Sequence, residues 1–494
     1  MRRVPLLADS RLVVAEPGPD DVVLHPPGRR ETLDDVPHAV REALAFPLAG
    51  EPLEQLVTRG GTATLVIEQP SLPIPTAHTG PRHQAIAAAG DELERLGVDR
   101  VTILVAGGLG RRTSPREIGL LVPPDFRRRF RGRVVVHDAE AEDLVELGQA
   151  GSVRLRVNPA LVETDLVVVV TAAETVLHGG PAALLGATGP ESLRAAGGLS
   201  LLETSGSQGW RLALELERLL LERVPVTGAS IVLNAPRVAG IFSGYPHDPE
   251  ATERLARAKS RRLFQLAPSG VRQRLLDRLP RELTAAAVYG GTPSVAHTEA
   301  LLRATVFRGT RIDQQLDAVV IGIPPTTPWM PRELPNPVTA AYLGLGLALR
   351  LWRNAPLVAD GGTAILVHPL VRRFPRPTQT PYRALFADAR TARDTDAMRV
   401  AEEAAAHDQI AIEDYRAGRA CHPLQPFLEW SACDATAHRL GAVLIAGSRD
   451  AHAARQLGFV PAHGLGAAVE MARGRGAKRI GYLVAPPFFP VTVG

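Results

Sequence analysis

The sequence Val101-Thr102-Ile103-Leu104-Val105-Ala106 runs directly into Gly107-Gly108-Leu109-Gly110. Its apolar residues follow one another without alternation, which is typical of a strand buried on both faces of a parallel sheet. Similar runs recur along the chain at Thr64–Glu68, Arg133–Val136, Leu166–Val170, Ser230–Leu233, Ala318–Ile321, Thr363–Val367, Ala442–Ala446 and Arg479–Val484. Helical stretches lie between them, such as His83–Leu96, Trp210–Arg223, Pro249–Gln265 and Ala397–Arg416. This alternation predicts a doubly wound α/β fold with mostly parallel sheets.

The length predicts more than one domain, because 494 residues are too many for a single hydrophobic core. The segment Leu266–Leu283 contains no strong strand candidate, so we place the main boundary within it. The expected domains are residues 1–270 and residues 271–494. An apolar fraction of 45% and a charged fraction of 22% are those of a globular protein and argue against a disordered chain.

The charge, the cysteines and the apolar runs of the chain exclude several kinds of binding partner and cellular location. The net charge of +4 is too small for this length to indicate a nucleic-acid or membrane surface. Cys421 and Cys433 have no partners at metal-site spacing, which argues against a cysteine-based zinc site and fits a reducing cytosol. The longest apolar run, Val338–Leu349, is too short to span a bilayer, and the N-terminus lacks a signal-peptide pattern. We therefore expect a cytoplasmic protein that binds neither nucleic acid nor membranes. These features do not decide between a monomer and a homo-oligomer.

The glycines Gly107, Gly108 and Gly110 are the first candidates for a binding site. Open α/β sheets bind ligands at the carboxyl ends of their strands, and glycines there let the backbone approach a ligand. Their spacing is not a dinucleotide-binding fingerprint, and a tight turn is the alternative interpretation. We take these three glycines as candidates for cofactor binding.

Two histidines also follow predicted strands. His178 lies in the polar cluster Glu174–Pro181 after Leu166–Val170, which makes it the best single candidate for a catalytic residue. His137 stands beside Asp138 at the end of another strand, and we take it as a substrate-binding candidate. The structural alternatives are a packing histidine for His178 and a turn capped by Asp138 for His137.

Four more residues complete the expected substrate site. Ser71 and Thr76 belong to a proline-containing loop, and Arg111 and Arg112 follow the glycines. The arginines supply cationic donors for a small-molecule anion. We find no candidate metal ligands.

Each of these loops is a weak signal by itself, but their order along the chain is specific enough to compare with known families. It comprises Gln69–Pro75, Ala106–Glu117, His137-Asp138, Asp143–Gly148, Val157-Asn158, Glu163–Leu166, Glu174–Pro181, Leu233-Asn234 and Val238–Gly244, followed more loosely by Gly322–Pro324 and Asp360–Thr363. In this order the chain resembles the nickel-dependent lactate racemase family and its relatives, the 2-hydroxyacid racemases and epimerases.

The resemblance implies two α/β domains facing each other across a cleft. It also implies a nickel pincer nucleotide, made from a nicotinic acid derivative, that a lysine tethers and a histidine helps to hold. In that family two histidines move the hydroxyl proton, while an arginine and a lysine hold the substrate carboxylate.

This sequence departs from the family at most of these positions. The arginine of the proline-containing loop corresponds to Leu72, and the histidine of the glycine loop corresponds to Gly110. A leucine cannot pair with a carboxylate, and a glycine cannot accept a proton. His178 matches the second catalytic histidine in an ungapped comparison, whereas a gapped one places Val176 there. Arg111 and Arg112 follow the glycine loop, and we expect them to supply the anion contact that is lost at Leu72.

The residues expected to hold the cofactor and the substrate are also missing. Residues 179–189 contain no tethering lysine, residues 197–209 contain no nickel histidine, and residues 340–349 contain no substrate lysine. Of the 56 lysines and arginines in the chain, only Lys259 and Lys478 are lysine, and neither falls in these segments. The cofactor is therefore unknown.

Three hypotheses follow. The first is a divergent family member that takes a small, 2-hydroxyacid-like anion in the interdomain cleft. The second is a 2-hydroxyacid racemase or epimerase that holds the nickel pincer cofactor non-covalently. The third is a non-catalytic family member that acts as a subunit or regulator. Because several catalytic residue types are missing together, we expect no ordinary lactate racemisation.

Overall fold

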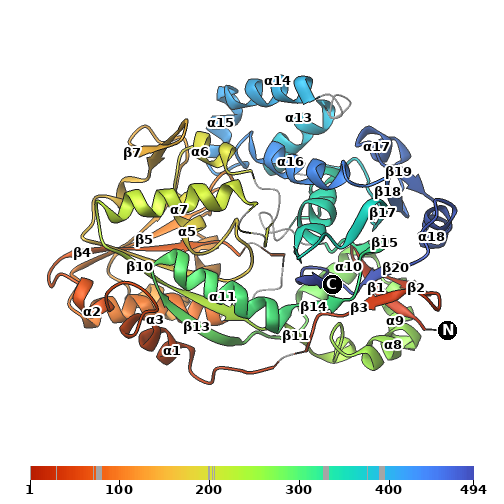
Figure 1. The fold of residues 1–494 in the computed structure, drawn as a ribbon, viewed down its shortest axis with the longest axis horizontal. Coiled ribbons are helices and arrows are strands. Elements are labelled where there is room, and N and C mark those ends of the chain that lie inside the picture. Colours follow the sequence, from red (N-terminus) through yellow and green to blue (C-terminus); the bar gives the residue numbers. More distant parts are fainter. Residues whose placement is uncertain are drawn as a thin grey trace.

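The computed structural model describes residues 2–28, 30–70, 72–73, 80–197, 201–202, 204, 206–325, 333–374, 377–388 and 395–494. They form two α/β domains that lie side by side (Figure 1). The predicted doubly wound architecture with mostly parallel sheets is confirmed. Among the described residues, no helix is both long and apolar enough to cross a membrane.

Within the described residues, the first sheet has the strand order β13-β10-β9-β4-β5-β6. Its strands are β4 (Thr62–Glu68), β5 (Arg100–Ala106), β6 (Arg133–Val136), β9 (Leu166–Ala172), β10 (Val226–Leu233) and β13 (Ala285–Gly291). Neighbours are parallel except for β13, which pairs antiparallel with β10. Ile103 and Val105 pack into the apolar cluster on one face, and Leu104 packs into the cluster on the other. Both faces are therefore buried, as the unbroken apolar runs indicate.

Helices cover both faces of this sheet. The Ile103 face carries α1 (Val36–Ala45), α3 (Pro81–Arg95) and α4 (Pro124–Arg129). The Leu104 face carries α5 (Pro181–Leu185) and α7 (Gln208–Leu221). Beside these two, α11 (Pro293–Arg308) packs on β10 and β13. The smaller elements are α2 (Leu53–Leu56), α6 (Pro190–Ala195) and the hairpin of β7 (Val145–Ala150) and β8 (Val153–Val157).

The second sheet has the order β19-β18-β17-β15-β20-β3 in the part of the chain that the structure describes, and its neighbouring strands are parallel. The strands are β3 (Val22–Leu24), β15 (Leu316–Gly322), β17 (Val358–Val367), β18 (Ala442–Ala446), β19 (Val460–Ala462) and β20 (Ile480–Leu483). Val319 and Ile321 face one apolar cluster, and Val320 faces the other. This sheet is thus also buried on both sides.

The two faces of the second sheet carry different elements. One carries α12 (Pro337–Ala341), the π-helical segment Tyr342–Leu347, α13 (Thr380–Asp388), α16 (Gln425–Ala437) and α17 (Ala451–Gln456). The other carries β1 (Val4–Ala8), β2 (Arg11–Ala15), α8 (Pro249–Arg257), α9 (Lys259–Leu266), α10 (Ser269–Asp277) and α18 (Leu465–Gly474). The remaining elements are α14 (Thr395–Ala406), α15 (Gln409–Arg416), β11 (Arg237–Val238), β12 (Arg281–Glu282), β14 (Thr310–Ile312), β16 (Trp352–Arg353) and β21 (Val491–Val493).

Two predicted helices are each divided into two. The stretch predicted at Pro249–Gln265 breaks at Ala258, whose backbone is extended between α8 and α9. The stretch predicted at Ala397–Arg416 breaks before Asp408. Its carboxylate accepts hydrogen bonds from the backbone N–H groups of Ile410 and Ala411, both at 3.1 Å, and so starts α15 as a new helix.

The strand pairing divides the chain differently from the predicted split into residues 1–270 and 271–494. The N-terminal strands β1, β2 and β3 lie in the same half as the C-terminal sheet (Figure 1), where β3 pairs with β20. Conversely, β13 belongs to the first sheet and α11 packs on that sheet, although both follow residue 270. The difference arises because long-range strand pairing, unlike a strand itself, leaves no local pattern in the sequence.

Candidate functional site

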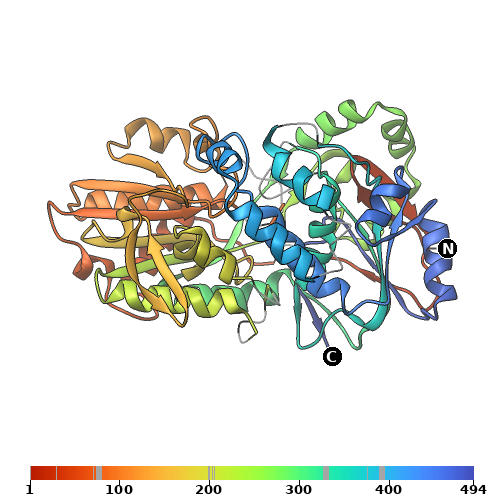
Figure 2. The same cartoon turned by 90° about the horizontal axis from the view of Figure 1, so that it is seen from above.

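A cavity of about 160 Å³ lies between the two domains, and we call it the interdomain cavity. The first domain lines it with residues at the carboxyl ends of β4, β5 and β9, where α/β sheets place ligands. The second domain lines it with the π-helical segment and with α16, which lies across the junction of the domains (Figure 2). The polar side chains in this wall belong to Glu68, Gln69, His178, Tyr342, Arg350, Gln425, Glu429 and Ser431, and the glycine loop adds Gly107, Gly108 and Gly110.

The predicted glycine loop, residues 107–110, forms part of this wall. Gly108 has a φ of +53°, a backbone conformation that favours glycine, and its N–H donates to the carbonyl of Gly186 at 2.9 Å. A Cβ on Gly107 would meet no atom within 4 Å, so packing does not require glycine there. The loop therefore presents backbone to open space at the end of β5.

His178 also lines the cavity, as the sequence led us to expect of a site residue. Its side chain is half-buried, and this burial lowers its pKa to about 4. The carboxylate of Glu174 opposes the shift, whereas Arg82 and His297 add to it. At neutral pH the imidazole is uncharged, so one ring nitrogen can accept a hydrogen bond.

Glu68, at the end of β4, is a site residue that sequence reasoning missed. Burial raises the pKa of its carboxyl to about 7, while Arg82 and the hydrogen bond from Gly179 oppose that rise. The Gly179 N–H donates to Glu68 Oε2 at 3.0 Å, which fixes the carboxyl beside the residue that follows His178. In the sequence, the feature that could have identified Glu68 as a site residue is its position at the end of an apolar strand.

Arg350 is the second residue that the sequence did not single out. It follows the apolar run Val338–Leu349, and its side chain is 2% exposed in the second-domain wall. Burial lowers its pKa to about 10, so the guanidinium remains charged at neutral pH. In the same wall the Glu429 carboxylate accepts hydrogen bonds from Tyr382 Oη at 2.7 Å and from Gln425 Nε2 at 3.1 Å.

The other predicted substrate residues lie elsewhere. Ser71 and Thr76 fall outside the described residues. Arg111 is not part of the cavity wall, and its guanidinium instead bonds to the Glu117 carboxylate. That carboxylate also accepts from Ser114 Oγ at 2.7 Å, so Arg111 closes a turn after the glycine loop. Burial alone would raise the pKa of Glu117, but the bonds from Ser114 and Arg111 outweigh it and lower the pKa.

His137 is a packing residue in this structure. It is 1% exposed, its Nε2 lies 2.9 Å from the carbonyl oxygen of Thr188, and its Nδ1 lies 3.3 Å from Asn158 Nδ2. Nε2 therefore donates and Nδ1 accepts. Burial lowers its pKa to about 4, which keeps the ring neutral. The sequence located His137 at a strand end but did not reveal that the side chain turns away from the cavity.

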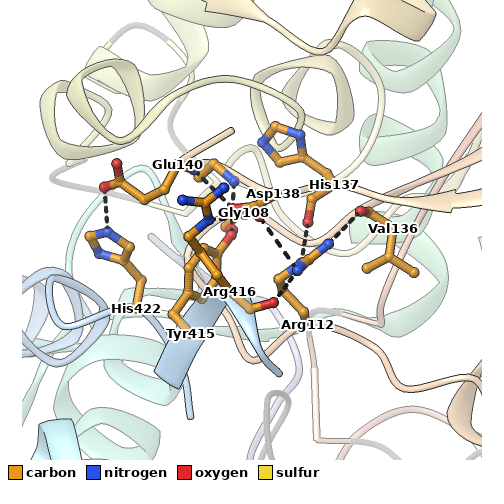
Figure 3. A network of polar contacts seen from close by, with 10 residues as sticks. Gly108, Arg112, Val136, His137, Asp138, Glu140, Tyr415, Arg416 and His422 are labelled. Atoms are coloured by element: carbon orange, nitrogen blue, oxygen red, sulfur yellow. Dashed lines mark hydrogen bonds and ion pairs between the residues drawn. The ribbon is translucent and has the colours of Figure 1, made fainter. Parts of the chain in front are cut away.

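Arg112 joins the two domains. Figure 3 shows its guanidinium between the carbonyls of Val136 and His137 on one side and that of Arg416 on the other. It also lies 3.4 Å from the Asp138 carboxylate, which in turn lies 3.6 Å from Arg416. Arg112 thus ties the glycine loop to α15 instead of lining the cavity.

Two further residues, Tyr415 and His422, complete this connection, which we call the α15 latch. Tyr415 Oη donates to the carbonyl of Gly108 and accepts from the N–H of Ala139, each at 3.0 Å (Figure 3). His422 Nε2 lies 2.8 Å from the Glu140 carboxylate, and the His422 N–H donates to the carbonyl of Leu109 at 2.9 Å. The latch therefore holds the second-domain wall against the glycine loop.

The residues present do not fit the nickel pincer nucleotide that the resemblance implies. The two lysines of the chain, Lys259 and Lys478, are exposed and line no part of the interdomain cavity. Among the residues that the structure describes, no three histidine, cysteine or acidic side chains converge to hold a metal ion. Within the described part of the chain, neither a lysine tether nor a set of metal-holding side chains lies at this cavity, and we derive no chemistry through that cofactor.

Comparison with known proteins supports the resemblance. A model of the lactate racemase N-terminal domain matches residues 17–179. No curated protein matches the chain. The lactate racemase apoprotein from Thermoanaerobacterium thermosaccharolyticum has a similar structure, with a TM-score of 0.63 and 14% identity over 100% of both chains. A protein from Thermotoga maritima shows a TM-score of 0.50 and 12% identity over 94% of this chain and 100% of its own.

At these identities the solved structures establish the fold, and the domain match establishes the relationship of the first domain. Both agree with the order of loops read from the sequence. Residues 17–179 are thus similar to the lactate racemase N-terminal domain, and the chain as a whole shares the fold of the lactate racemase apoprotein.

Proposed function

We propose that the chain binds a small carboxylate of the 2-hydroxyacid type in the interdomain cavity. The observation that carries this proposal is Arg350, a cation that is 2% exposed in the second-domain wall. A guanidinium holds a carboxylate through charge-assisted hydrogen bonds that are often bidentate. Arg350 also directly follows residues 340–349, where the family resemblance leads us to expect a lysine for the substrate carboxylate.

The size of the cavity supports a ligand of this class. Its volume is about 160 Å³. An apolar cavity of about 150 Å³ in another protein accepts benzene, which has six non-hydrogen atoms. Lactate has the same number of non-hydrogen atoms, so the volume suits a short hydroxyacid.

The first-domain wall supplies groups for the ligand's hydroxyl. The neutral His178 ring can accept its hydrogen, and the Glu68 carboxyl lies beside the same loop. A carboxyl with a pKa of about 7 is suited to exchange protons near neutral pH. This feature favours, as a second candidate function, acid–base catalysis on the bound acid by Glu68 and His178 over binding alone.

Calorimetric titration with lactate and with lactamide tests the binding proposal. Lactamide has the shape of lactate but no charge, so it should bind at least about tenfold more weakly. Arg350→Met should cause a similar loss for lactate, while Arg350→Lys should retain part of the affinity. Arg383→Met is a matched control, because Arg383 is exposed on α13 and lines no part of the cavity.

Equal affinity for lactate and lactamide would contradict the proposal. So would wild-type affinity in a folded Arg350→Met variant. Circular dichroism melting of each variant distinguishes lost binding from lost folding.

A further inference from the structure

A second cavity, of about 140 Å³, lies where the end of α11 meets the second domain, and we call it the α11 cavity. Figure 1 shows that the end of α11 lies beside β11 and β14. Aromatic and aliphatic side chains make up most of the wall, including Phe242, Tyr245, Leu276, Phe488 and Phe489. Four of these five are at most 5% exposed, so an apolar group placed there would be shielded from water.

Arg308, the last residue of α11, is the exceptional residue in this wall. It is 4% exposed, and it lines both the α11 cavity and a neighbouring cavity of about 60 Å³. Its side chain makes no hydrogen bond or ion pair with any residue that the structure describes. A buried guanidinium without a partner is strongly unfavourable, so its position calls for an anion from outside the chain.

The other polar groups in the wall are already engaged. Tyr245 Oη donates to the carbonyl of Pro5 at 3.2 Å. Both ring nitrogens of His247 lie within 3.2 Å of backbone carbonyl oxygens. Arg281 Nη2 donates to the carbonyl of Leu276 at 2.7 Å. A ligand's anionic group would therefore find its main hydrogen-bond donor in Arg308.

The charged groups nearest to Arg308 are held by one another rather than by Arg308. Arg82 pairs with Glu174 at 2.9 Å, and the same carboxylate oxygen accepts a hydrogen bond from the Leu72 N–H at 3.2 Å. Arg82, Glu174 and Glu68 all line the small cavity that Arg308 shares with them. Glu174 therefore attracts Arg308 at longer range but pairs directly with Arg82, and an anion in the α11 cavity would give Arg308 a direct partner.

We propose that Arg308 and the α11 cavity form a second binding site, for a small carboxylic acid with an aromatic or branched apolar body. The carboxylate pairs with the Arg308 guanidinium, and the apolar body occupies the aromatic wall. A benzene-sized group matches the volume, because a cavity of about 150 Å³ in another protein holds benzene. This site is separate from the interdomain cavity and shares no residue with its wall.

Calorimetric titration of the full chain with phenylacetate and with phenylacetamide tests this site. Phenylacetate should bind, and phenylacetamide should bind at least about tenfold more weakly because it lacks the charge. Arg308→Met should weaken phenylacetate binding by a similar factor. Its melting temperature without ligand should equal or exceed that of the wild type, because an unpaired buried charge is removed.

Two more variants sharpen the result. Arg303→Met removes an arginine from the same helix that lies over Phe307 and pairs with Glu31 instead of lining either cavity, so it should leave the affinity unchanged. Leu279→Trp adds bulk within the aromatic wall and should abolish binding while Arg308 stays intact.

Absence of phenylacetate binding to the wild type would overturn the proposal. So would equal binding of the acid and the amide, or unchanged affinity in Arg308→Met. Lactate titration of Arg308→Met separates this site from the interdomain cavity: lactate affinity should stay at the wild-type value even if the α11 site fails.

Discussion

Two opposing effects act on the pKa of the Glu68 carboxyl. It ends the buried strand β4, so its carboxyl loses water and its pKa rises to about 7. Arg82 and the Gly179 N–H nevertheless favour its charged form. The protein therefore keeps a carboxyl that changes charge near neutral pH beside His178.

Replacing Glu68 with glutamine should change how stability depends on pH. An unfolded glutamate loses its proton near pH 4.5, whereas folded Glu68 loses it near pH 7. The stabilisation associated with the protonated form is fully present below pH 4.5 and is lost as the pH rises through 7. Relative to Glu68→Gln, the wild type should lose about 1 to 2 kcal/mol between pH 5 and 8, after allowance for solvent screening. Urea unfolding at several pH values measures the difference.

The matched control is Glu51→Gln, at an exposed position that lines none of the described cavities. Its unfolding free energy should follow that of the wild type across the same pH range. Parallel curves for the wild type and Glu68→Gln would show that Glu68 is more solvated than its position indicates.

At the same scale, the sequence predicted some site residues and not others. His178 and the glycine loop follow continuous apolar strands, and parallel strands end at one edge of a sheet, so their place at the cavity could be predicted. Arg112 and His137 also follow strands, but their side chains turn toward the latch and the core. The direction of a side chain beyond a strand end depends on packing from distant segments, which no local pattern records. Arg350 escaped notice because a single arginine after an apolar run is common.

At the scale of elements, the α15 latch decides how the cavity walls meet. Tyr415 is fully buried and uses its single hydroxyl twice, as donor to Gly108 and as acceptor from Ala139. Its ring also packs with Leu109, Ala139 and Leu424 in one apolar cluster. One side chain of the second domain thus fixes two loops of the first.

Tyr415→Phe should loosen this latch without emptying the apolar cluster. The substitution leaves the carbonyl of Gly108 and the N–H of Ala139 without their partner, at a cost of about 1–3 kcal/mol in unfolding free energy. Hydrogen exchange should increase in α15 and in the loops after β5 and β6. Tyr289→Phe, on β13 outside the latch, should leave that exchange unchanged. Uniform exchange changes across both domains would argue that the latch is not a local element.

Strands could be predicted better than the breaks in helices. Each predicted strand coincides with an observed one within a few residues, because burial on both faces requires an unbroken apolar run. The break at Ala258 has no proline or glycine to mark it. The three-residue strand β3 is too short to show a pattern, although its pairing with β20 places the N-terminus in the second domain.

At the scale of the whole molecule, the chain passes repeatedly between the domains. It begins in the second domain, forms most of the first, and returns to the second for α8, α9 and α10. It then adds β13 and α11 to the first domain before completing the second. Leu72 and Leu201 of the first domain also pack in the main apolar cluster of the second. A cut at any single point therefore leaves one domain incomplete.

The fragments 1–270 and 271–494 should consequently fail to fold alone and should form a folded complex when co-expressed. The first lacks β13 and α11, and the second lacks the hairpin β1–β2 and the edge strand β3.

An autonomous first domain should instead contain residues 30–309 with residues 236–282 replaced by a Gly-Ser linker of about four residues. The two ends already meet, because the Asn234 N–H donates to the carbonyl of Thr284 at 2.9 Å. Thermal unfolding followed by circular dichroism should give one cooperative transition for this shortened chain and none for fragment 1–270. A cooperative transition in fragment 1–270 alone would show that the first domain folds without β13 and α11. The predicted split at residue 270 would then separate two units that fold independently, even though the strand pairing crosses it.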